Sequence, residues 1–63
     1  MPTSVTIRSS GSSWVDAVYS PDDGGWWLHR VDGPGASYAS KRIYPTADAA
    51  RRAYDRGKVK WEH

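Results

Sequence analysis

The stretch YPTADAA at residues 44–50 marks the point where the chain is expected to change from strand to helix. Thr46 suits a helix N-cap, because its hydroxyl can accept a hydrogen bond from an otherwise unpaired amide of the first turn. Asp48 then lies in that first turn, where a negative charge interacts favourably with the helix dipole. The alanines favour helix, and Gly57 is typical of the residue just beyond a helix C-terminus. We therefore predict a helix over residues 46–56.

Before this helix, the sequence has the alternation of strands separated by tight turns. β-Branched and aromatic residues alternate with polar ones, which is the pattern of half-buried strands. The predicted strands lie near residues 3–8, 14–19, 25–31 and 38–44. Turn residues (Pro, Asp and Gly) are dense at 20–25 and at 32–35, and connections this short favour antiparallel neighbours. Residues 58–62 alternate again, so they are either a last short strand or a tail that packs back on the body.

These elements predict a single domain over residues 1–63, of the α+β class. We expect a three- to four-stranded antiparallel β-meander with one C-terminal α-helix packed on one face. Ala47, Ala50 and Tyr54 recur at helical spacing and form its expected buried stripe. The chain has no cysteine, so its four tryptophans and four tyrosines, each burying on the order of 150–250 Å², are expected to supply much of the small core.

One helix covers only one face of such a sheet, and the sequence divides the strand residues between two faces. The predicted buried face carries Val15, Ala17, Tyr19, Ala39 and Ile43. The predicted open face carries Trp14, Val18, one of Trp26 and Trp27, Tyr38, Ser40, Arg42 and Tyr44. An exposed aromatic face indicates a binding surface, unless the first strand or the Trp61 tail folds over it. A register slip of one residue would exchange the two faces.

Charge is distributed unevenly along the chain. The net charge is +2, with −2 over residues 1–40 and +4 over residues 41–63. A basic segment of this kind favours an anionic partner. The alternative is a solvated helix that carries charge for solubility.

A family resemblance covers residues 14–54. An aromatic-led strand ends in YSPDDG at 19–24, a later strand contains SKRIY at 40–44, and PTADAA at 45–50 opens a helix. This pattern resembles the arm-type DNA-binding domains of phage tyrosine integrases, which are three-stranded sheets backed by one C-terminal helix. The resemblance implies that the sheet enters the major groove, with base or phosphate contacts from Arg30, Lys41 and Arg42. The layout also resembles small phage and bacterial sheet–helix proteins without a settled function, and a chain of this size fits the size range of phage-encoded regulators and inhibitors.

Two functions follow as hypotheses. The first is a small non-catalytic protein that binds nucleic acid, specifically DNA, through an aromatic and basic sheet face. The alternative is an inhibitor or adaptor of the phage-regulator type that binds a host or cellular protein through its exposed Trp/Tyr face. A homodimer is also compatible with the sequence. The candidate contact residues are Trp14, Trp26, Trp27, Arg30, Tyr38, Lys41, Arg42, Tyr44, Arg51 and Arg52.

Catalytic motifs are missing from the sequence. Neither His29 nor His63 pairs with a cysteine or a recognisable nucleophile, and no glycine-rich phosphate loop precedes a helix. His29 with Asp16 or Asp32 would supply two metal ligands at best, short of the three or four that a site needs. We therefore predict no enzymatic activity, no cofactor and no metal. Since there is neither an apolar run of about 20 residues nor a signal-peptide pattern, we expect a cytoplasmic protein without a membrane partner.

Overall fold

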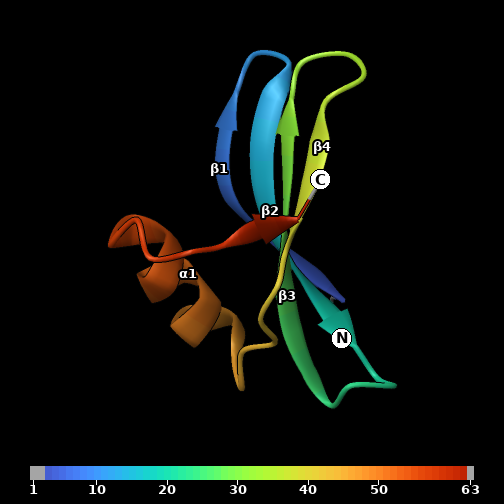
Figure 1. The fold of residues 1–63 in the computed structure, drawn as a ribbon, viewed down its shortest axis with the longest axis vertical. Helices are drawn as coiled ribbons and strands as arrows, with labels where there is room; N and C mark the ends of the chain where they lie inside the picture. The colour runs from blue at the N-terminus through green and yellow to red at the C-terminus, as the bar shows by residue number, and fades with distance from the viewer. Residues whose placement is uncertain (1–2, 63) are drawn as a thin grey trace.

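The computed structural model describes residues 3–62. Predictions that concern the first two residues or His63 lie outside this part of the chain. One helix, α1 (Ala47–Asp55), follows the fourth of five strands. The strands are β1 (Ser4–Ser10), β2 (Ser13–Ser20), β3 (Gly25–Asp32), β4 (Ser37–Ser40) and β5 (Trp61–Glu62). They form one antiparallel sheet in the order β1-β2-β3-β4-β5, with α1 against one side (Figure 1). The predicted α+β meander is confirmed, and the C-terminal segment adds a short fifth strand.

The long hairpin of β2 and β3 is the scaffold of the sheet. All eight residues of β2 pair with the eight of β3, from Ser13 opposite Asp32 to Ser20 opposite Gly25. β1 pairs with β2, and its register shifts around Ile7. A bulge of this kind re-aims a side chain, and Ile7 packs against the core.

The helix forms as the sequence predicts, one residue shorter at each end than 46–56. The Thr46 hydroxyl accepts a hydrogen bond from the Ala49 amide at 3.0 Å, which caps the first turn. Gly57 ends the helix at φ +67°, a conformation that costs glycine less than any residue with a side chain. Ala50 is completely buried, and its small side chain lets the helix lie close to β2 and β3.

The core is small and lies between α1 and the sheet. Its buried members are Val15, Ala17, Leu28, Tyr44 and Ala50. Ala17 and Leu28 stand opposite each other in the central hairpin, and the predicted burial of Val15 and Ala17 is confirmed. Three partly buried aromatic residues pack around this core: Trp26, Tyr54 and Trp61.

The predicted faces of the fourth strand are reversed in the structure. β4 ends at Ser40, which is buried, and the register puts Tyr38 on the same helix-covered side while Ala39 faces away. Further along, Ile43, expected inside, is 43% exposed, and Tyr44, expected outside, is buried. Since adjacent strand residues point to opposite faces, a slip of one position accounts for the exchange of Tyr38, Ala39 and Ser40.

A single hydroxyl explains why β4 stops early. The Ser40 Oγ accepts a hydrogen bond from the Leu28 amide at 2.9 Å and donates one to the Arg42 carbonyl at 2.8 Å. The side chain thus replaces the carbonyl that a continued strand would offer to β3. Residues 41–43 leave the sheet and are exposed, and the chain rejoins β3 only where Trp26 and Tyr44 exchange two backbone hydrogen bonds.

One further expectation for the buried face fails. Tyr19 lies on the helix side, opposite Trp26 in the register, yet 39% of its surface is exposed. Its ring packs against Trp26 with centroids 5.5 Å apart. Tyr19 therefore covers the edge of the core instead of filling it.

Candidate functional site

The face of the sheet turned away from α1, called the outer face here, carries aromatic and aliphatic side chains. Trp14 stands opposite Val31, and Val18 stands opposite Trp27. Between these pairs, Asp16 stands opposite His29, and the Trp27 and His29 rings have centroids 5.5 Å apart. The outer face is therefore apolar at both ends and polar in the middle.

No arginine or lysine of the described strands lies on the outer face. The only strand cations are Arg8 and Arg30, and both share the helix side with their partner Val15. The expected combination of aromatic and basic groups on one open sheet face is therefore not what this register produces. The expected place of Tyr38 on the open face is likewise wrong, since it pairs with Arg30 across the ladder.

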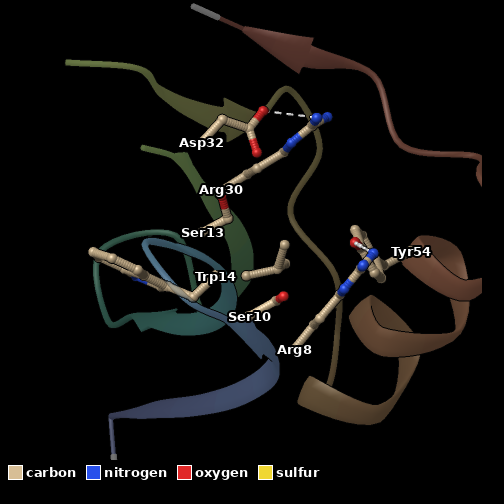
Figure 2. Close-up of a pocket in the computed structure, with 8 residues that line it drawn as sticks. Arg8, Ser10, Ser13, Trp14, Arg30, Asp32 and Tyr54 are labelled. Atoms are coloured by element: carbon tan, nitrogen blue, oxygen red, sulfur yellow. Dashed lines mark hydrogen bonds and ion pairs between the residues drawn. The ribbon is translucent and has the colours of Figure 1, made fainter. Parts of the chain in front are cut away.

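Arg30 is held by several neighbours. Its Nη2 lies 2.7 Å from Asp32 Oδ2, as Figure 2 shows. The guanidinium carbon also lies 5.5 Å from the centre of the Tyr38 ring and 5.6 Å from that of Trp61, within the range of a cation–π contact. Arg30 thus fastens β5 to the sheet, and its charge is shared with Asp32.

A polar cleft of about 370 Å³ is lined by residues of β1, β2, β3 and the end of α1 (Figure 2). Arg8 points across it and donates a long hydrogen bond of 3.4 Å to the Tyr54 hydroxyl. The Trp14 ring lines the rim and points away from Arg8 and Tyr54. Because Arg30 is paired with Asp32, Arg8 is the one cleft cation without an ion pair among residues 3–62.

A second hollow region gathers most of the remaining cations. It consists of two adjoining hollows, of about 320 and 350 Å³, that share Arg42 and Lys58. The first lies against α1, with Ala49 and Ala53 in its lining. We call the whole region the basic groove and define it by its six cations: Lys41, Arg42, Arg52, Arg56, Lys58 and Lys60.

Three segments supply these cations, and local structure explains each placement. Arg52 and Arg56 are four residues apart at the end of α1 and so share one side of the helix. Lys58 and Lys60 alternate in the chain that leads to β5, and the Lys41 amide donates to the Lys60 carbonyl at 2.9 Å. That bond places the segment released from β4 next to the C-terminal segment.

The groove has a strong excess of positive charge. No aspartate or glutamate lines either hollow. Arg52 forms an ion pair with Asp48 at 2.9 Å, whereas the other five groove cations form none with any carboxylate of residues 3–62. Like charges gathered in a hollow raise the local positive potential, and an anion in the hollow relieves their repulsion.

The residues predicted as one contact surface lie on five different parts of the molecule. Lys41, Arg42 and Arg52 lie in the groove, and Tyr44 lies beneath them, mostly buried. The others lie elsewhere: Trp14 and Trp27 on the outer face, Trp26 against the core, Arg30 and Tyr38 under β5, and Arg51 between Asp48 and Asp55.

Sequence reasoning missed half of the groove. Arg56, Lys58 and Lys60 were not among the predicted contacts, although the charge of +4 over residues 41–63 marked the right segment. Their convergence depends on the helix ending at Gly57 and on the chain then returning to β4. Residue spacing alone does not contain that return path.

Comparisons with protein-family models, curated proteins and solved structures find no match to this chain. The resemblance to integrase arm-type domains therefore stays a prediction. Within residues 3–62, no helix is long and apolar enough to cross a membrane. The same residues hold no group of three or more His, Asp or Glu side chains placed to bind a metal ion.

Proposed function

We propose that this protein is a non-catalytic nucleic-acid-binding protein whose contact surface is the basic groove. The observation that carries the proposal is the gathering of six cations from three segments with no acidic side chain in the lining. Phosphates are the anions that such a surface fits, because arginine and lysine donate charge-assisted hydrogen bonds to phosphate oxygens. This contact surface differs from the sheet face that the integrase resemblance implies.

The electrostatic contribution has a measurable signature. Neutralising phosphates releases condensed counterions, so the logarithm of the binding constant falls linearly with the logarithm of salt concentration, by about 0.9 per contact on B-form DNA. If all six groove cations contact phosphates, the slope is about −5. Affinity then falls about a thousandfold between roughly 50 and 200 mM salt.

The test is fluorescence anisotropy of a labelled mixed-sequence duplex DNA over that salt range. The double variant Lys41→Ala/Arg42→Ala should bind more weakly and flatten the slope by about 2. Its matched control is Arg8→Ala/Arg51→Ala, which removes the same total charge outside the groove and should change the slope little. Circular dichroism checks that both variants are folded.

Three outcomes contradict the proposal. The first is absence of duplex binding at low salt. The second is equal flattening by the groove variant and its control, which would mean that net charge alone attracts the DNA. The third is equally tight binding of polyglutamate with a similar number of charges, which would make the groove a site for acidic protein segments.

The outer face supports a second candidate function, the binding of another protein. Trp14 and Trp27 lie there beside Val31 and Val18, and large aromatic anchors dominate protein interfaces. For a partner bound in this way, Trp27→Ala should weaken the binding free energy by about 2 kcal/mol or more. The variant Lys41→Ala/Arg42→Ala should bind that partner as tightly as the unchanged protein does. Light scattering coupled to size-exclusion chromatography tells whether a second copy is that partner.

A further inference from the structure

Within residues 3–62, the lining of the basic groove offers no exposed aromatic ring on which a base could stack. Proteins that bind single strands combine a basic channel with aromatic rings on which bases stack. The aromatic residue lining the basic groove, Tyr44, is only 9% exposed. Trp61 follows Lys60 in sequence, but its ring packs edge-on against Tyr54, with centroids 6.4 Å apart.

Trp14, which is 39% exposed, and the half-buried Trp27 lie on the other side of the sheet from the groove. Trp14 and Trp27 occupy the outer face, whereas α1, which carries Arg52 and Arg56, packs against the opposite face. A base stacked on either tryptophan would therefore lie away from the groove cations. On the same face, Asp16 lies between the two tryptophan positions, opposite His29, and its charge would repel a phosphate.

From this separation we infer that the nucleic acid bound by the groove is a duplex, held through its phosphates without base stacking. The inference rests on the proposed function and names its ligand class. A duplex presents phosphates on its outside with bases already stacked, so it needs cations and no aromatic platform. Phosphate contacts fix position but carry no sequence information, so binding by this groove is independent of sequence.

The shape of the groove agrees with this ligand. Long cationic side chains surround a lining that includes Ala49 and Ala53, whose methyl groups leave room above the helix. The cations spread over two adjoining hollows and come from the end of α1, from the segment after β4 and from the segment before β5. Cations distributed over two hollows suit a backbone of successive phosphates better than a single compact anion.

The experiment compares three labelled probes by anisotropy while tryptophan emission is recorded. The probes are a mixed-sequence duplex, a second duplex of scrambled sequence, and an unstructured single strand of the same length. The two duplexes should bind equally. If the two binding constants are equal at 1 M salt, slopes that differ by about 0.2 for each of six contacts make the duplex bind about 30-fold more tightly than the single strand in roughly 50 mM salt.

Tryptophan emission and a second variant separate the outcomes. The protein's emission should change little on duplex binding, and Trp14→Ala/Trp27→Ala should leave duplex affinity unchanged. Equal or tighter binding of the single strand, with quenched emission that this variant removes, overturns the duplex inference while the proposed function stands. If no probe binds at low salt, the proposed function itself fails.

Discussion

Replacing Ser40 by alanine should destabilise the protein by about 1–3 kcal/mol, the cost of a buried polar group left without a partner. The Ser40 Oγ accepts the Leu28 amide at 2.9 Å, and the Leu28 residue has no exposed surface. Water therefore cannot reach the amide once the hydroxyl is gone. The Arg42 carbonyl also loses its donor, but Arg42 is exposed and water can replace that bond.

Thermal and urea denaturation measure this effect directly. For a domain of this size, 2 kcal/mol corresponds to a fall in Tm of about 8–16 °C. The urea midpoint should fall while the slope of the unfolding free energy with urea stays constant, because the surface exposed on unfolding hardly changes. Tryptophan emission gives a convenient signal in a chain with four tryptophans.

Ser37→Ala is the matched control, because Ser37 begins the same strand but is exposed. It should change stability by less than about 0.5 kcal/mol, as ordinary surface substitutions do. If Ser40→Ala and Ser37→Ala have equal effects, the Ser40 hydroxyl does not substitute for a strand carbonyl. The early end of β4 would then have another cause.

Two more substitutions test the local structure around the groove. Gly25→Ala should lower the free energy of unfolding, measured with urea, by about 1–3 kcal/mol. The reason is that the added Cβ would lie 2.7 Å from the Tyr44 carbonyl oxygen. An unchanged urea midpoint would mean that the backbone moves apart at this contact without cost. Thr46→Ala should cost about 1 kcal/mol through loss of the N-cap bond to Ala49. Thr46→Ser should keep most of that stability in thermal melts, and equal melting of the two variants would show that the cap contributes nothing.

Structural features that depend only on residues close together in the sequence could be predicted. The helix follows from Thr46, the alanines and Gly57, all within one short segment, and the structure confirms it. The buried side of β2 follows from Val15 and Ala17 flanking Asp16, since that alternation holds whatever the partner strand is.

The fourth strand could not be predicted in the same way. Its alternation fits either register, and a polar Ser40 beside Ala39 suggests that the serine faces water. What reverses this assignment is the amide of Leu28, twelve residues away. A serine side chain that replaces a backbone partner is a tertiary effect, and neither composition nor periodicity records it.

The candidate site also depends partly on neighbouring residues and partly on tertiary contacts. The resemblance to integrase arm-type domains implies contacts from Lys41 and Arg42, but the groove also needs Arg56, Lys58 and Lys60. Those three join only because β5 returns to pair with β4. The sequence thus predicted an anionic partner for this part of the chain without predicting the surface that receives it.

The fold itself explains why the unpaired charge gathers where it does. Of the strand arginines, Arg30 is held by Asp32, and Asp48 lies within ion-pair distance of both Arg51 and Arg52 on the helix. The groove cations left without an acid lie at the helix end and in the segments that leave or rejoin the sheet. Such exposed positions contribute little to the core, so substitutions there should alter stability by less than about 0.5 kcal/mol. Affinity for a polyanion can therefore change independently of the fold, and this independence is what makes the groove variants usable as tests of function.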